Sequence, residues 1–163
     1  MYDVAVIGCG IVGAAAAYEL SRYNCRVLVL EAKNDVANVT TKANSAILHA
    51  GYDPTPGTLM AETNVRGVAL AKELCEKLDV EREEIGSLVL AFGEEDERHL
   101  EKLYQQGLAN GVPGIELLTA DEVHALEPNV SDKVTAALYA PTAAIVSPWE
   151  YALALAETAV VNG

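Results

Sequence analysis

The feature that most constrains the fold is a set of three glycines with G-x-G-x-x-G spacing near the N-terminus. They are Gly8, Gly10 and Gly13, in VIGCGIVGAAAA. They follow DVAVIG (3–8), an apolar run typical of a buried parallel strand, and they open an alanine-rich segment (11–24) that predicts a helix. RVLVLE (26–31) then predicts a second strand. The result is a βαβ unit of about 30 residues, the setting in which this glycine pattern indicates dinucleotide binding.

Each glycine of this pattern has a physical role. Gly8 permits the tight turn after the strand, Gly10 lets backbone N–H groups approach a pyrophosphate, and Gly13 lets the helix pack close to the strand. The helix N-terminus offers unpaired N–H donors and a positive dipole end to the diphosphate. Glu31 ends the second strand, where a carboxylate can accept hydrogen bonds from both ribose hydroxyls, which disfavours NADP. The pattern does not distinguish NAD from FAD.

The rest of the chain predicts a mixture of helices and strands. Four helices are expected: 55–80, 94–109, the short segment ADEVHALE, and a last helix from Pro148 that is closed by Asn162–Gly163. Thr119 is expected to be the N-cap of the short helix, with Glu122 at its third position. Strands are expected at 85–92, at 115–119 and twice within 134–148, around Pro141. A doubly wound sheet needs a third parallel strand, and none follows the second βα unit directly. We therefore expect the chain to be the N-terminal part of a longer protein.

Charge and cysteine content exclude several classes of protein. The net charge is -13, from 24 acidic and 11 basic residues, which disfavours binding to nucleic acid and to anionic membrane surfaces. The three cysteines form no CxxC pair or Cys/His cluster, so neither a disulfide framework nor a metal site is indicated. No apolar run approaches the length of about 20 residues that a transmembrane helix needs. These observations predict a cytoplasmic protein without a transmembrane segment.

A second informative stretch is NSAILHAGYDPTPG (44–57), which places His49 among small and apolar residues. A histidine titrates near neutral pH and can act as a general base. A lone histidine in an apolar run is more often a hydrogen-bonded structural residue. The stretch alone leaves both readings open.

Two segments together resemble the FAD-dependent oxidoreductases of the D-amino-acid oxidase superfamily. They are YDVAVIGCGIVGAAAAYELSRYNCRVLVLEA and TTKANSAILHAGYDPTPGTLMA, where family members carry N-S-G-(V/I)-(I/L)-H-A-G followed by P-G-(S/T)-L. GSLVLAF and SPWEYALALAETAVVNG fit the same pattern, so the resemblance spans nearly the whole chain. The nearest branch is similar to flavin glycerol-3-phosphate dehydrogenases and L-2-hydroxyglutarate oxidases.

The resemblance implies an α/β fold: a Rossmann-like FAD-binding βαβ with a truncated part of an inserted α+β substrate domain. The expected divisions are a first FAD-binding segment at 1–83, a partial substrate or cap domain at 84–147, and a helix returning to the FAD-binding domain at 148–163. Two departures from the family pattern stand out: Cys25 where a glycine is usual before the second strand, and Ala46 in place of the glycine of N-S-G.

The resemblance also implies roles for individual residues. His49 would be the catalytic residue, lying with Ala50 and Gly51 beside the isoalloxazine on the substrate side. The expected FAD-binding residues are Gly8, Gly10, Ile11, Val12, Gly13, Glu31, Ala32, Thr41, Asn44, Ser45, Ala50 and Gly51. No metal is expected. Arg66 and Lys42 are the basic residues nearest the expected site.

The function that the resemblance implies is oxidation of a small anionic hydroxy compound by hydride transfer to FAD. Glycerol 3-phosphate is the favoured substrate and L-2-hydroxyglutarate the second. The alternatives are an FAD amine or amino-acid oxidase and, for these residues alone, a non-catalytic nucleotide-binding module. An electron-acceptor partner is expected. The family's substrate-anchoring arginine and second flavin-binding stretch are expected after residue 163, so the fragment by itself is expected to be inactive.

Overall fold

The computed structural model describes residues 1–163, which divide into two compact units. Unit 1 comprises Met1–Ile47, Glu73–Arg82 and Val146–Gly163, and unit 2 comprises Leu48–Lys72 and Glu83–Ile145. The expected α/β class with a Rossmann-like βαβ is confirmed, whereas the expected division at 83/84 and 147/148 stays a prediction.

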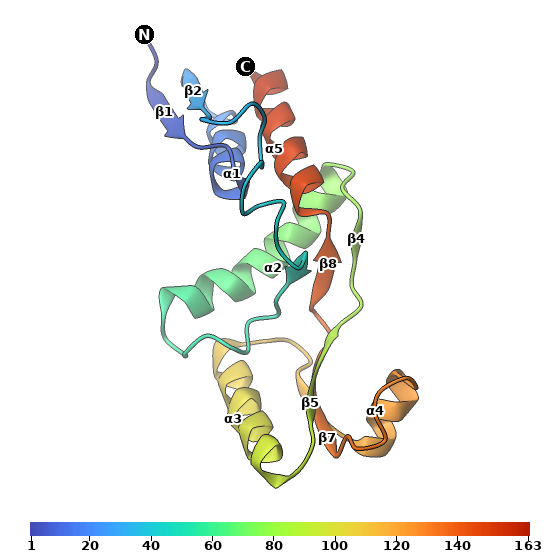
Figure 1. Ribbon diagram of the computed structural model, residues 1–163. Coiled ribbons are helices and arrows are strands. Elements are labelled where there is room, and N and C mark those ends of the chain that lie inside the picture. The colour runs from blue at the N-terminus through green and yellow to red at the C-terminus, as the bar shows by residue number, and fades with distance from the viewer. The chain divides into compact units, whose positions relative to one another are not determined.

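Unit 1 is built on the βαβ that the glycines predicted. Strands β1 (Val4–Ile7) and β2 (Val27–Leu30) pair in parallel, and α1 (Ile11–Leu20) connects them. Helix α5 (Pro148–Asn162) packs along α1, and the two helices lie side by side in Figure 1. Their shared core consists of Cys9, Ala14, Tyr18, Ala37, Ala152 and Leu155. The alanines allow the two helices to approach closely, because they add little side-chain volume between the backbones.

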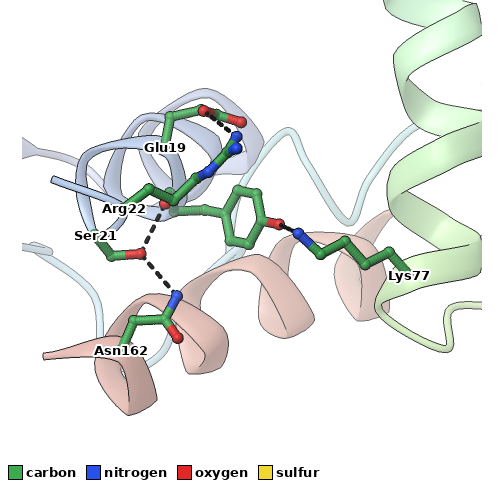
Figure 2. A network of polar contacts seen from close by, with 6 residues as sticks. Glu19, Ser21, Arg22, Lys77 and Asn162 are labelled. Carbon is green, nitrogen blue, oxygen red and sulfur yellow. Dashed lines mark hydrogen bonds and ion pairs between the residues drawn. The ribbon is translucent and has the colours of Figure 1, made fainter.

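Polar side chains join the elements of unit 1 at the end of α1. The Ser21 hydroxyl donates to the Tyr18 carbonyl at 2.7 Å, and the Asn162 amide of α5 donates to the Ser21 oxygen at 3.1 Å. On the other side, Lys77 Nζ donates to the Tyr18 hydroxyl at 2.9 Å. Figure 2 shows Ser21 between α1 and Asn162 of α5. Helix α1 is therefore fixed at its C-terminal end by contacts from two other segments.

Unit 2 contains an antiparallel sheet of order β5-β7-β6, made of β5 (Ser87–Ala91), β7 (Ala136–Ala140) and β6 (Glu116–Thr119). Helix α3 (Glu94–Asn110) runs beside this sheet in Figure 1, and Leu100 and Leu103 are buried against it. The short helix α4 (Ala120–Leu126) follows β6. Its predicted capping box is confirmed, with the Thr119 hydroxyl and the Glu122 carboxylate each bonding the other residue's backbone N–H.

Three very short strands form a third sheet, of order β3-β8-β4. They are β3 (Ile47–Leu48), β8 (Ala144–Val146) and β4 (Arg82–Glu83). The sequence predicted neither β3 nor β4, because two residues show no periodicity and β4 is charged throughout. Two helices are also shorter than predicted: α1 ends at Leu20 and α2 (Leu59–Lys77) begins three residues after Pro56. No helix is both long and apolar enough to cross a membrane.

Gly67, in the middle of α2, gives a stability prediction. A Cβ added there meets no heavy atom within 4 Å, and the residue is exposed. Because glycine is the poorest helix former after proline, Gly67→Ala is expected to raise the free energy of unfolding by about 0.5–1 kcal/mol. Urea unfolding of both proteins measures the difference. A destabilised variant would contradict the open surroundings of Gly67.

Candidate functional site

The turn from β1 into α1 presents backbone groups rather than side chains. Gly8 has a φ of +93°, in the region that favours glycine, and its N–H extends the β1–β2 pairing by donating to the Leu30 carbonyl at 2.7 Å. Gly10 is the N-cap of α1 in an extended conformation, and as a glycine it has no side chain of its own to cap the helix. The N–H groups of the first helical turn have no intrahelical partner, so they form a site suited to an anion.

Gly13 marks the closest approach in this turn. A Cβ at residue 13 would lie 1.9 Å from the Gly8 carbonyl oxygen, a distance that no packing adjustment of a side chain can relieve. The first turn of α1 therefore lies directly against the backbone of the glycine loop. Any side chain at this position must displace backbone and with it the N–H groups that face the anion site.

The loop that follows β2 passes beside the same turn and holds it. Thr41 Oγ1 accepts a hydrogen bond from the Ile11 N–H at 3.1 Å, and a Cβ at Gly10 would come within 3.0 Å of this oxygen. The Ala37 N–H donates to the Cys9 carbonyl at 2.8 Å, with Ala37 buried and at a φ of +56°. The sequence singled out Thr41 but not Ala37, because a backbone contact leaves no signal in residue type.

Glu31 lies beside this turn and bonds to it. Its carboxylate accepts hydrogen bonds from the Cys9 N–H at 2.7 Å and the Lys33 N–H at 2.8 Å. The bond from Cys9, followed by that from Lys33, holds the pKa of Glu31 below its usual range, against a smaller opposing effect of desolvation. Each carboxylate oxygen keeps a further lone pair for a ribose hydroxyl. Glu31 and Cys9 also line a cavity of about 450 Å³, whose other walls are mainly apolar.

The lowered pKa of Glu31 gives a pH prediction with a definite sign. A depressed carboxyl pKa contributes stability that is present above the unfolded-state pKa of about 4.3 and is lost as the pH falls through the folded-state value. Glu31→Gln is therefore expected to be less stable than the parent at neutral pH, and the difference is expected to shrink as the pH falls below about 4. Denaturant unfolding across this range measures it. If the difference in the free energy of unfolding between the two proteins did not change with pH, the ionised Glu31 carboxylate would not be stabilised by the Cys9 and Lys33 N–H groups.

Asn44 organises the loop that leads to His49. Its amide nitrogen donates to the Thr40 carbonyl at 3.1 Å and the Thr41 carbonyl at 2.7 Å, and its oxygen accepts from the Ala46 N–H at 2.8 Å. Ala46 has a φ of +62°, a conformation that favours glycine and that costs an alanine about 1 kcal/mol. The Asn44 side chain is thus engaged by backbone, and its contact with a cofactor stays a prediction.

His49 follows β3 and begins an irregular loop in unit 2. Its side chain is 53% exposed, and its Nδ1 lies 4.0 Å from an Asp53 carboxylate oxygen. The Asn64 amide of α2 donates to the His49 carbonyl. The imidazole is therefore open to a ligand, whereas its backbone is fixed. The exposure of its side chain is unlike that of a core histidine, and its catalytic role stays a prediction.

The residues after His49 are held more tightly. Gly51 has a φ of +107°, and a Cβ there would lie 2.7 Å from Val65 Cγ2 of α2, so only glycine fits. Ala50 is 1% exposed and Tyr52 is also buried, both in the core that includes Leu103. The Ala50 methyl is committed to this core, which leaves only backbone groups of Ala50 for the expected contact with a flavin ring.

The candidate residues thus fall into two sets. Unit 1 holds the expected FAD-binding residues Gly8, Gly10, Ile11, Val12, Gly13, Glu31, Ala32, Thr41, Asn44 and Ser45, and unit 2 holds His49, Ala50 and Gly51. Direct contacts join the turn, Glu31 and Thr41. Val12 is 80% exposed at the helix start, and Ala32 and Ser45 are exposed as well. The structure describes the two sets separately, and their meeting at one flavin is a proposal.

The parallel βαβ, the glycine turn against the N-terminus of α1 and the carboxylate of Glu31 define a dinucleotide-binding α/β protein. Residues 3–163 match the family described as FAD dependent oxidoreductase (DAO), and the chain belongs to this family.

Three relatives illustrate the family. The chain is 52% identical over 163 residues to a glycerol 3-phosphate dehydrogenase of Caloramator mitchellensis, covering all of this chain and 34% of that protein. It is 34% identical over 149 residues to the mitochondrial L-2-hydroxyglutarate dehydrogenase of Dictyostelium discoideum, covering 90% of this chain and 33% of that protein. A dithionite-reduced, FAD-bound L-α-glycerophosphate oxidase of Mycoplasma pneumoniae superimposes with a TM-score of 0.91 at 34% identity, covering 99% of this chain and 43% of that one. The chain thus spans about a third of the curated relatives it matches.

Proposed function

We propose that the protein carrying this chain oxidises a small anionic hydroxy compound by hydride transfer to FAD, with glycerol 3-phosphate as the favoured substrate. The observation that carries the proposal is the exposed imidazole of His49 on a loop whose backbone is fixed from α2. The 52% identity over the whole chain to a glycerol 3-phosphate dehydrogenase supports the choice of substrate. The similarity to an L-2-hydroxyglutarate dehydrogenase keeps that hydroxy acid as the second candidate.

The glycine turn fits the diphosphate of FAD. Thr41 already accepts from the Ile11 N–H, so the N–H groups of Gly10, Val12 and Gly13 are the donors that the helix start offers to phosphate oxygens. The absence of side chains at residues 8, 10 and 13 lets a phosphate reach these donors. Glu31 would accept from the ribose hydroxyls through the lone pairs that Cys9 and Lys33 leave free.

Bound FAD supplies the acceptor for the hydride that leaves the substrate carbon. In the proposed reaction, the unprotonated ring nitrogen of His49 takes up the proton of the substrate hydroxyl as the C–H bond breaks, so that a carbonyl forms. The exposed side chain allows a substrate to reach this nitrogen, and the fixed carbonyl of His49 holds the ring's attachment point in place. Lys42 and Arg66 are proposed to attract the anionic group of the substrate.

Anaerobic stopped-flow reduction of the complete, FAD-loaded protein tests this function. Glycerol 3-phosphate is expected to bleach the flavin's visible absorption band faster than L-2-hydroxyglutarate, glycine or proline. Faster bleaching by L-2-hydroxyglutarate would make that hydroxy acid, and not glycerol 3-phosphate, the favoured substrate. Bleaching by an amino acid alone would show that the enzyme oxidises a C–N bond, and would overturn the proposal.

The electron acceptor and the location in the cell stay predictions. All three cysteines are free, and Cys9 and Cys75 are buried. We propose a cytoplasmic protein that passes its electrons to a separate acceptor.

A further inference from the structure

We propose that Asp53 is a positioning residue for His49, which keeps the proton of the neutral ring on Nδ1 and so leaves Nε2 to accept the substrate's proton. The use of Nε2 in catalysis rests on the proposed function; the orientation of the ring by Asp53 does not. The two side chains lie four positions apart in the loop, with 4.0 Å between Nδ1 and the nearer Asp53 oxygen.

Five backbone carbonyls of this loop accept hydrogen bonds from side-chain amides of α2 and α3. Asn64 donates to the carbonyl of His49, Asn110 to those of Gly51 and Pro54, and Gln106 to those of Tyr52 and Asp53. The bonds from Asn110 measure 2.9 and 2.8 Å, and those from Gln106 measure 3.3 Å. The segment is neither helix nor strand, so its carbonyls depend on these amides for their partners. The amides therefore fix the backbone at both His49 and Asp53.

The residues between His49 and Asp53 are anchored as well. Ala50 and Tyr52 are buried in the core of unit 2, and Gly51 lies against Val65 with no room for a Cβ. With the intervening backbone held by core packing and by hydrogen bonds, the fold sets the separation of the two points at which these side chains join the backbone. Only side-chain torsions remain to adjust the distance between the imidazole and the carboxylate.

The hydrogen-bonding chemistry of His49 and Asp53 determines which ring nitrogen carries the proton. A carboxylate only accepts hydrogen bonds, and a neutral imidazole carries one N–H, so the carboxylate favours the ring form with the proton on the facing nitrogen. A distance of 4.0 Å is longer than a direct hydrogen bond. Because both side chains are more than half exposed, they are free to rotate, and the proposal requires a small rotation that brings the two atoms within hydrogen-bonding distance.

Nitrogen-15 NMR of the histidine ring in the complete protein tests the orientation directly, at a pH at which the ring is neutral. The His49 signals are assigned by their loss in His49→Gln. In the parent protein, Nδ1 is expected to show the shift of a protonated nitrogen and Nε2 that of an unprotonated one. Asp53→Asn, which keeps the shape but offers an N–H as well as an oxygen, is expected to move the ring toward a mixture of the two forms. Identical ring shifts in the parent and the variant would overturn the proposal.

Kinetics give a second readout. Asp53→Asn is expected to lower kcat about tenfold, at the low end for loss of a residue that orients a functional histidine, while KM changes by less than about twofold. Asp53→Glu, which restores the carboxylate, is expected to recover part of kcat. Glu95→Gln removes an exposed acid of α3 and serves as the charge-matched control, with unchanged kcat. Loss of FAD or an equal loss in Asp53→Glu would show that residue 53 acts on folding, and would contradict the proposal.

The two experiments separate the possible failures. If the hydroxy compounds do not reduce the flavin, the proposed function fails, but the ring shifts still decide whether Asp53 orients His49. If the flavin is reduced and the ring form is the same in both proteins, only the role of Asp53 fails.

Discussion

Replacement of Gly13 by alanine is expected to weaken the binding of FAD to the complete protein by about 100-fold. The added Cβ would lie 1.9 Å from the Gly8 carbonyl oxygen, so the first turn of α1 must move away from the glycine loop. Overpacking of this kind costs about 1–3 kcal/mol of stability, and it costs more where the clash is relieved only by a shift of the backbone. A comparable loss in binding energy, about 3 kcal/mol, corresponds to a roughly 100-fold weaker affinity for FAD. Titration of the apoprotein with FAD, together with thermal unfolding, measures both effects.

Gly67→Ala is the matched control for Gly13→Ala. Both positions lie in helices and receive the same added methyl, but residue 67 has nothing within 4 Å of it. FAD affinity is expected to be unchanged in the control. Normal FAD binding by Gly13→Ala would contradict the close contact between α1 and Gly8, and equal losses in both variants would trace the effect to helix chemistry in general.

Replacement of His49 by glutamine is expected to lower the rate of flavin reduction by about 10²–10⁴-fold, the usual contribution of a general base. Glutamine can still hydrogen-bond to a substrate, but its amide does not take up a proton near neutral pH. FAD binding is expected to persist, because the residues proposed to hold the diphosphate lie in unit 1. Stopped-flow reduction at saturating glycerol 3-phosphate measures the rate of the chemical step.

His99→Gln is the control for the histidine variant. His99 is an exposed residue of α3, and the same substitution there is expected to leave the rate unchanged. A rate in His49→Gln within a factor of about three of the parent would contradict a role in proton transfer.

The parts of the fold that the sequence predicts well are those set by local pattern. The βαβ follows from an apolar run, a glycine turn and an alanine-rich helix, and the cap of α4 follows from Thr119 and Glu122. The G-x-G-x-x-G spacing within a βαβ unit predicts close helix packing at Gly13, and the 1.9 Å between a Cβ there and the Gly8 carbonyl oxygen gives that role its physical reason. Short strands such as β3 escape prediction because their pairing depends on distant segments.

The site itself was predictable only in part. His49 stood out as an unusual residue in an apolar stretch, but nothing local indicated Asp53, whose relevance depends on the path of the loop between them. The amides of Gln106 and Asn110 lie more than fifty positions away in the sequence and look like ordinary polar residues of a helix. Contacts of this range become visible only in three dimensions.

The central claim is that the glycine turn and the His49 loop serve the same bound FAD, and a crystal structure of the complete FAD-loaded protein tests it most directly. The claim predicts diphosphate oxygens within hydrogen-bonding distance, about 2.7–3.2 Å, of N–H groups in the first turn of α1, and the His49 ring beside the isoalloxazine. A diphosphate bound elsewhere, or a His49 ring separated from the flavin by other side chains, would contradict it.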